Sequence, residues 1–250
     1  MGEIGIIVGR GSSINQNEIS RTLSKKGYFV KKVAEDWPRD VYVFHNNKII
    51  SNDWNVPYNF LGDGGNIQVS DDFVLISDTA LIDQNLNEEF KGKGDLKNLI
   101  LQKAEKEFES KVYLAPTDFK SENSVSTHID LYTLLLPNSK ILMFDNKFGK
   151  DANKNFEYNR IAEENEFKFF EYDSGKDDVW YGLNSLVLKK GEKDIVVLES
   201  QSKNLIKLLN QNNVETIPIE MLQSLYPAGR IHCQTNTFKR EDQKKIDYFF

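Results

Sequence analysis

The sequence has few of the residues that cross-link a fold or anchor it in a membrane. Of its 250 residues only Cys233 is a cysteine, which excludes an internal disulfide framework and a cysteine-rich zinc site. No apolar run approaches the roughly 18 residues that span a bilayer, and the first residues lack the basic stretch of a signal peptide. We therefore expect a cytoplasmic protein without a membrane partner.

Positively charged residues are also fewer than negatively charged ones. The chain has 38 Asp and Glu against 32 Lys and Arg, a net charge of −6, which favours neither nucleic acid nor an anionic surface as a partner. In contrast, apolar residues make up 39% of the chain, with 16 Phe, 10 Tyr and 3 Trp. This composition supplies a substantial core and excludes disorder as the dominant state.

The order of the expected elements predicts an α/β fold built from repeated units. The chain starts with a strand at 4–8, a short helix that ends near Gly27 and a strand at 29–33. About five units of hairpin, helix and strand then follow roughly 50 to 65 residues apart, although the residue identities do not repeat. Such units cannot bury a face alone, so we expect them to surround one axis as a single domain, residues 1–250. The expected hairpins are 41–44 with 48–51, 66–69 with 73–76, 131–136 with 140–144 and 183–188 with 194–198; the expected helices are 96–108, 155–164 and 202–209; single strands follow at 112–115, 167–172, 215–219 and 231–238.

Four short polar clusters stand where these units begin. Each has a plain structural explanation by itself: an exposed ion pair, a tight Asp-Gly turn, a core histidine or an inert buried thiol. The clusters are Asp36-Trp37-Pro38-Arg39-Asp40, Gly62-Asp63-Gly64-Gly65-Asn66, Thr127-His128-Ile129-Asp130 and Gly229-Arg230-Ile231-His232-Cys233.

Together the clusters predict cysteine chemistry on a cation. Units around one axis bring the leading ends of their strands to one mouth, which would hold Cys233, His128 and the carboxylates Asp40, Asp63 and Asp130. A thiol beside a histidine is an apparatus for covalent catalysis. Three carboxylates would raise the pKa of the thiol unless the substrate brings positive charge, and a guanidinium matches carboxylates in shape and charge.

The clusters, in this order, resemble motifs of the guanidine-modifying enzyme superfamily. Trp37-Pro38-Arg39-Asp40 is similar to the Trp-x-Arg-Asp of agmatine, arginine and bacterial peptidylarginine deiminases, and residues 62–66 to their acidic-Gly-Gly-Asn/Asp motif. His128-Ile129-Asp130 resembles the family's His-x-Asp, and residues 231–235 its Ile-His-Cys-x-Thr. The resemblance covers about residues 37 to 238 and implies the pentein fold, an α/β propeller of five pseudo-symmetric ββαβ modules.

The sequence also departs from the deiminase pattern. Asp63 replaces the commoner Glu, Val41 replaces Gly or Pro, and Asn236-Thr237 replaces a Gln-Gln pair. The chain is short for agmatine and arginine deiminases and closer in length to dimethylarginine hydrolases. The superfamily resemblance therefore leaves free arginine, a methylated arginine, agmatine and a peptidyl arginine as candidate substrates.

The resemblance implies roles for the motif residues. Cys233 attacks the guanidino carbon, and His128 protonates the departing nitrogen and then activates water to release a ureido product. Asp40 and Asp63 hold the guanidinium, and Asp130 orients His128 or shares in that binding. Trp37, Arg39 and Asn184 are further expected substrate contacts, and Trp180 is an alternative to Trp37 for stacking on the cation. The reaction needs no metal and no organic cofactor, because the substrate is the electrophile.

Three other interpretations remain open at this stage. An amidinotransferase would use the same motifs and pass the amidino group to an amine instead of water. A protein of the same fold could bind arginine side chains without turnover, although no catalytic residue is missing from the motifs. Cys233 could also be a structural thiol in an unrelated α/β enzyme.

Overall fold

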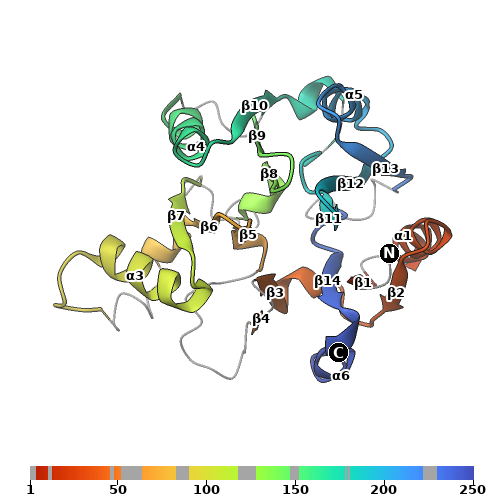
Figure 1. Cartoon of the computed structure of the whole chain (residues 1–250), viewed down its shortest axis with the longest axis horizontal. Helices are drawn as coiled ribbons and strands as arrows, with labels where there is room; N and C mark the ends of the chain where they lie inside the picture. Colours follow the sequence, from red (N-terminus) through yellow and green to blue (C-terminus); the bar gives the residue numbers. More distant parts are fainter. Residues whose placement is uncertain are drawn as a thin grey trace.

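A computed structural model gives the arrangement of the chain (Figure 1). It describes residues 4–10, 13–45, 48–51, 64–82, 90–117, 128–146, 152–177, 179, 181–221 and 230–250. The strands are β1 (Ile4–Val8), β2 (Phe29–Lys32), β3 (Tyr42–His45), β4 (Lys48–Ser51), β5 (Ile67–Val69), β6 (Phe73–Ser77), β7 (Lys111–Ala115), β8 (Thr133–Leu136), β9 (Ile141–Asp145), β10 (Lys168–Tyr172), β11 (Leu186–Lys190), β12 (Lys193–Glu199), β13 (Glu215–Ile219) and β14 (Thr235–Lys239). The helices are α1 (Ser13–Lys25), α3 (Leu96–Phe108), α4 (Ala152–Glu164), α5 (Lys203–Gln211) and α6 (Gln243–Ile246).

The described strands form five small sheets, as the order of elements predicts. Their strand orders are β14-β1-β2, β3-β4, β5-β6-β7, β8-β9-β10 and β11-β12-β13. One strand of each sheet faces the middle of the molecule, and these five line a common cavity (Figure 1). We call β3, β5, β8, β11 and β14 the inner strands. The mixed α/β architecture expected from the sequence is thus confirmed.

The first sheet joins the two ends of the described chain. β1 pairs antiparallel with β14, so that Ile4 lies opposite Lys239 and Val8 opposite Thr235. β1 also pairs in parallel with β2. The strand–helix–strand start and the final strand are therefore parts of one unit, which the sequence pattern presents as two separate pieces.

Helix α3 shows how local sequence sets an element. The side chain of Asp95 accepts hydrogen bonds from the backbone N–H groups of Lys97 and Asn98 and thereby caps the first turn. The apolar residues Ile100, Ala104 and Phe108 follow at helical spacing and pack against β6 and β7. Helix α3 spans the predicted 96–108, and it covers one face of its sheet as α4 and α5 cover theirs (Figure 1).

Three inner strands begin two or more residues later than the sequence pattern predicts. The expected strand starts, residues 131, 183 and 231, lie in turns, and β8, β11 and β14 begin at Thr133, Leu186 and Thr235. In β8 and β14 the hydroxyl of the first threonine donates to the carbonyl of an isoleucine four residues earlier, Ile129 at 2.5 Å and Ile231 at 2.6 Å. Side chains of this kind compete with the sheet for backbone groups, so the chain turns before it extends.

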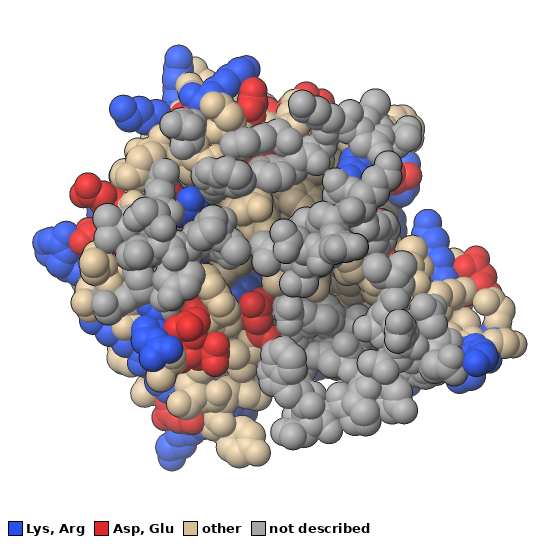
Figure 2. All heavy atoms as spheres, turned by 180° about the vertical axis from the view of Figure 1, so that it is seen from behind, with Lys and Arg blue, Asp and Glu red and all other residues tan. Residues whose placement is uncertain are grey.

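The described surface carries charges of both signs. Figure 2 shows Lys and Arg interspersed with Asp and Glu around the described part of this face. Of the helices in the described ranges, not one combines the length and the apolar character that a membrane span requires.

Candidate active site

The residues singled out by the motifs lie at the leading ends of the inner strands, where the chain enters each of them. This placement brings residues from all five sheets toward one end of the strands. Asp40 ends the turn before β3, Gly65 lies in the turn before β5, Asp130 lies in the turn before β8, and Asn184 and Cys233 each stand two residues before β11 and β14.

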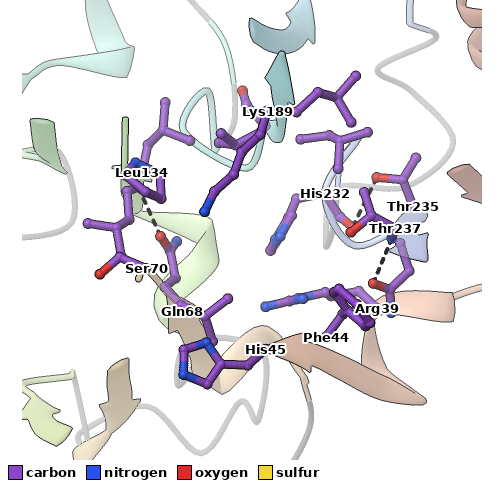
Figure 3. A pocket seen from close by; sticks show the side chains of 18 of the residues that line it. Arg39, Phe44, His45, Gln68, Ser70, Leu134, Lys189, His232, Thr235 and Thr237 are labelled. Atoms are coloured by element: carbon purple, nitrogen blue, oxygen red, sulfur yellow. Dashed lines mark hydrogen bonds between the residues drawn. The ribbon is translucent and has the colours of Figure 1, made fainter. Parts of the chain in front are cut away.

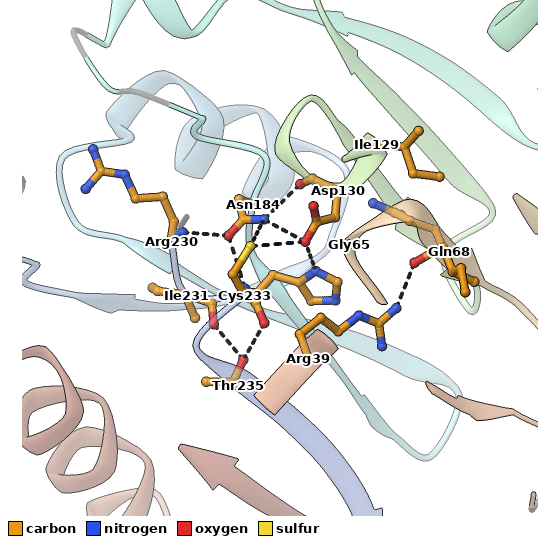
Figure 4. Close-up of polar contacts among 12 residues, drawn as sticks. Arg39, Gly65, Gln68, Ile129, Asp130, Asn184, Arg230, Ile231, Cys233 and Thr235 are labelled. Atoms are coloured by element: carbon orange, nitrogen blue, oxygen red, sulfur yellow. Dashed lines mark hydrogen bonds and ion pairs between the residues drawn. The ribbon is translucent and has the colours of Figure 1, made fainter. Parts of the chain in front are cut away.

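Asp130, Asn184 and Cys233 form a buried cluster (Figure 4). The Nδ2 of Asn184 donates to Asp130 Oδ2 at 2.8 Å and lies 3.2 Å from the Sγ of Cys233. The thiol itself lies 3.4 Å from the same carboxylate oxygen. The amide oxygen of Asn184 accepts from the backbone N–H groups of Arg230 and Cys233, so one side chain positions both the carboxylate and the cysteine.

The environment of Cys233 holds its thiol in the protonated form. Burial is the largest effect and raises the pKa of the thiol well above its usual value, and the charges of Asp130 and Asp40 raise it further. The hydrogen bond from Asn184 acts in the opposite direction. The direction agrees with the sequence-based expectation, but burial contributes more to it than the carboxylates do.

His128 lies against Gly65 of the second motif. A Cβ on Gly65 would come within 2.4 Å of His128 Nδ1 and 3.0 Å of Asp130 Oδ1. A Cβ on Gly64 would come within 2.0 Å of the carbonyl oxygen of Arg39. Both positions therefore require glycine for close approach, because a real Cβ does not fit at these distances. The tight turn at 64–66 thereby packs directly against two other motifs.

Asp40 belongs to the same assembly. Its Oδ1 accepts a hydrogen bond from the backbone N–H of Gly65 at 3.1 Å. The turn that carries Asp40 is held from β14, because Asn236 Nδ2 donates to the carbonyls of Pro38 and Tyr42. In the sequence Asn236 is notable only as a departure from a Gln-Gln pair, because its structural role depends on contacts across almost 200 residues of chain.

His232 is a site residue to which the sequence analysis assigned no role. Its Nδ1 lies 2.7 Å from Asp130 Oδ2, and the ring is largely buried. Burial lowers the pKa of His232, and the charge of Arg39 lowers it further, so the imidazole is neutral and donates its Nδ1 hydrogen to the carboxylate. The signal was present in the motif, since His232 directly precedes the cysteine.

The same bond keeps Asp130 ionised. Burial opposes its charge, but the hydrogen bond from His232 and the nearby charges of His128 and Arg39 outweigh burial and hold the pKa of Asp130 below its usual value. The orienting hydrogen bond that the structure gives to Asp130 is therefore with His232, whereas the sequence analysis considered only His128 for it. A carboxylate fixed in this way beside a thiol is prepared to meet a cation.

Arg39 is buried beneath this cluster. Its Nη2 donates to the carbonyl of Ile67 at 2.7 Å. Burial lowers the pKa of Arg39, and the charges of Asp130, Asp40 and Cys233 oppose that effect. Within the described structure the guanidinium thus binds the backbone of β5 and offsets the nearby carboxylates. The substrate contact expected from its motif stays a prediction.

A buried ion pair supports the segment that carries the cysteine. Arg230 Nε lies 3.1 Å from Glu199 Oε1, and both side chains are almost fully buried. The backbone N–H of Arg230 also donates to Asn184. Breaking such a pair from one side leaves an uncompensated buried charge, so Arg230 fixes the chain three residues before Cys233.

The remaining motif residues are placed as follows. Trp37 is partly buried and packs against the apolar cluster that contains Cys233. Asp63, Thr127 and Trp180 lie outside the described residues. Among the residues the structure describes, no three His, Cys, Asp or Glu side chains form a group that could bind a metal ion.

Comparisons with known proteins show similarity in fold. No family model matches the chain. The N-terminal domain of ArgZ, an arginine dihydrolase from the ornithine-ammonia cycle in cyanobacteria, is similar over 94% of this chain and 97% of that domain, with a TM-score of 0.61 and 12% sequence identity. DDAH from Pseudomonas aeruginosa, in a complex with citrulline, is similar over 95% of this chain and 100% of that one, with a TM-score of 0.58 and 11% identity.

One curated protein is similar in sequence over a short segment. Inosamine-phosphate amidinotransferase 1 from Streptomyces glaucescens is 32% identical over 62 residues, which are 25% of this chain and 17% of that protein. The match therefore spans less than a fifth of that protein. The structural similarities extend over nearly the whole chain, and they confirm the fold that the motifs implied: the chain has the pentein fold of the guanidine-modifying enzymes.

Proposed function

We propose that this protein is a cysteine-dependent hydrolase that acts on the guanidino group of arginine or of an arginine derivative. The observation that carries the proposal is the contact of the buried Cys233 thiol with the Asp130 carboxylate, which Asn184 bridges. A carboxylate beside a nucleophile opposes an anionic substrate and favours a cationic one. A guanidinium is planar, permanently charged and able to donate to two carboxylates at once.

The proposed reaction uses the thiol as a covalent catalyst. The guanidinium binds between Asp40 and Asp130, and its charge offsets the field that keeps Cys233 protonated. His128 takes the thiol proton as Sγ bonds to the guanidino carbon, and then gives that proton to the departing amine or ammonia as the C–N bond breaks. The product of this step is an amidino-thioether on Cys233.

Water completes the cycle. His128 removes a proton from water as the oxygen bonds to the amidino carbon, and the C–S bond then breaks to release a ureido product and the thiol. Asp63 is proposed as a third carboxylate at the guanidinium, and Trp37 as a wall of the substrate site. Asn184 and His232 position Asp130 and Cys233 through their hydrogen bonds, and Arg39 lies beneath this cluster.

The pentein fold supports this assignment, because the arginine dihydrolase ArgZ and the citrulline-bound DDAH share it. We propose that residues 1–250 form a single catalytic domain in which the five sheets close into a propeller around the inner strands. The cytoplasmic location expected from the sequence stays a prediction.

An amidinotransferase is the second candidate. The 62-residue similarity to inosamine-phosphate amidinotransferase 1 favours it specifically. In this reaction an amine replaces water in the second step, and the product is a new guanidino compound. The chemistry at Cys233 is otherwise the same, so the two reactions differ in whether water or an amine attacks the amidino carbon of the thioether.

One experiment separates the candidates. The protein is incubated with arginine, methylated arginine, agmatine or a peptidyl arginine, each alone and with glycine or lysine as acceptor, and Cys233→Ser serves as the inactive control. A ureido product without acceptor supports the hydrolase, and a new guanidino product that requires the acceptor supports the transferase. If neither forms with any of the four compounds, while labelled arginine still binds, the protein is a binding protein and the proposal is wrong.

A further inference from the structure

The cavity that the five inner strands line lies behind the candidate active site. It has a volume of about 440 Å³ and is lined by residues of all five inner strands (Figure 3). Cavities of this size hold small organic ligands in many proteins. The proposed reaction uses none of the space in this cavity.

The cavity extends to the end of the inner strands that is opposite to the catalytic cluster. His45, Asp71 and Lys189 line it, and they stand at or just beyond the trailing ends of β3, β5 and β11. Arg39 and His232 line it from the other side. Since His232 Nδ1 is bonded to Asp130, these two side chains separate the cavity from the candidate active site.

The polar lining is rich in nitrogen groups. Lys189, His232 and Arg39 extend into the space between the strands, and His45 lies at its wall (Figure 3). Asp71 is the one carboxylate among the lining residues, and it pairs with Lys189 at 2.7 Å near the exposed rim. With the imidazoles neutral, two cations therefore face a single anion.

Two of these nitrogens are buried and lack a hydrogen bond. Nε of Arg39 and Nε2 of His45 are both inaccessible, and no described residue pairs with either. The side chains are 7% and 4% exposed. Buried polar groups in folded proteins nearly always have partners, so these two nitrogens leave the polar part of the cavity wall incompletely satisfied. Because both atoms are inaccessible while the cavity is empty, an occupant meets them only when the side chains of Arg39 and His45 rotate toward it.

The walls between these groups are apolar. Phe44, Leu134, Leu186 and Leu188 line the cavity beside the polar side chains. An occupant with an anionic end and a few carbon atoms would satisfy both kinds of surface. Inorganic phosphate shares the anionic end but not the apolar part.

We propose that this cavity is a second ligand site, which binds a small oxyanion, a carboxylate or a phosphate, on Lys189, Arg39 and His45. The proposal is independent of the reaction proposed for Cys233. The bound anion would lie on the cavity side of Arg39 and His232 and offset the positive charge of Arg39. Because that charge opposes the field of Asp130, occupation of the cavity would disfavour the Cys233 thiolate and couple the two sites.

The test measures binding to the intact protein by isothermal titration calorimetry at constant ionic strength. The probes are succinate, inorganic phosphate and succinamide, which is the neutral counterpart of succinate. We expect succinate or phosphate to bind and succinamide not to bind. Succinate alone would assign a carboxylate, and phosphate alone would assign a phosphate.

Charge variants at the rim decide where the anion binds. Lys189→Gln should weaken binding by about tenfold, the loss of one charge-assisted hydrogen bond, and Asp71→Asn should strengthen it. Lys190→Gln and Asp72→Asn are the matched controls, because these neighbours carry the same charges and do not line the cavity. Both pairs of positions are exposed, so folding should be unaffected.

The coupling has a readout that needs no turnover. Saturating succinate or phosphate should slow the alkylation of Cys233 by iodoacetamide, and Lys189→Gln should reduce this effect. If neither anion binds, or if Lys189→Gln and Lys190→Gln change binding equally, the proposed site is wrong. If an anion binds through Lys189 but the alkylation rate does not change, the coupling is wrong and the site remains.

Discussion

The Oδ2 of Asp130 lies 3.4 Å from the Sγ of Cys233, and both side chains are buried. An ionised carboxylate at this distance disfavours the thiolate, as does burial itself. The free protein therefore keeps its nucleophile protonated, and a bound cation changes that balance. The proposed substrate thus helps to generate the group that attacks it.

The first prediction concerns the titration of this thiol. Because burial, Asp130 and Asp40 raise the pKa of Cys233, neutral iodoacetamide should inactivate the free protein slowly near neutral pH and faster as the pH rises. A small cationic haloamidine should react much faster at the same pH, and substrate should protect. Both rates are measured from roughly pH 6 to 10. A thiol that titrates near pH 6 would instead indicate a preformed ion pair with a histidine.

The second prediction is that Cys233→Ser abolishes turnover and leaves the protein folded. A hydroxyl is a much weaker nucleophile than a thiol, and it is close to a thiol in size. Product formation and the thermal unfolding curve are measured together. Substantial activity in a correctly folded variant would remove Cys233 from the mechanism.

The third prediction tests the role of Asn184 as the link between Asp130 and Cys233. Asn184→Ala removes two donors from the cluster and leaves the backbone N–H groups of Arg230 and Cys233 without their acceptor. We expect the free energy of unfolding to fall by about 2–4 kcal/mol and alkylation of Cys233 to slow, because the bond from Asn184 lowers the pKa of the thiol.

Asn138→Ala is the control for this variant. Asn138 is half-buried, and its described bonds, to the carbonyls of Gly191 and Lys193, are exposed to solvent, so its loss should change the free energy of unfolding by no more than about 0.5 kcal/mol. Equal effects of the two substitutions, measured by urea denaturation, would contradict the linking role.

The fourth prediction is that Gly65→Ala displaces His128. The new methyl group would stand 2.4 Å from Nδ1 and 2.9 Å from Cγ of the ring, which must move. A shift of about 1 Å in a catalytic group costs roughly 100-fold in rate, and we expect a loss of that size in kcat. Gly175→Ala, where the methyl group would approach only Asp173, is the control. An unchanged kcat in Gly65→Ala would show that His128 takes no part in the reaction.

The fifth prediction concerns stability and pH. Burial raises the pKa of Asp78 to about 6, although hydrogen bonds from Thr117 and the charge of Lys154 oppose the shift. A carboxyl whose pKa is higher in the folded state than its usual 3.8 adds stability at low pH. That contribution is lost as the pH rises through about 6. The free energy of unfolding of the wild type relative to Asp78→Asn should therefore decrease from pH 4 to pH 6.5 in urea titrations, and a constant difference would contradict the shift.

Helix α3 and the site residues show what the sequence could and could not predict. The bounds of α3 follow from a local cap at Asp95 and from apolar spacing, which a sequence displays directly. The grouping of the motifs followed from the expected arrangement of the repeated units around one axis and from a family resemblance. The bond between Asp130 and His232 joins residues 102 positions apart, and Asn236 holds Pro38 from across 198 positions. No local pattern encodes such contacts, because they depend on how whole sheets pack.

The pairing of β1 with β14 has a consequence for how the molecule assembles. Ile4 and Lys239 must meet before this sheet exists, which is among the most distant contacts the described chain can make. Closing a loop of this length costs more conformational entropy than closing a short loop. Proteins whose contacts are mostly distant in sequence also fold more slowly than proteins whose contacts are mostly local. Since β14 follows directly on the turn that carries Cys233, we expect the nucleophile to reach its position when β14 pairs with β1. In a partly folded chain that lacks the pairing of β1 with β14, the catalytic cluster would therefore be incomplete, and the thiol of Cys233 would not be held beside Asp130.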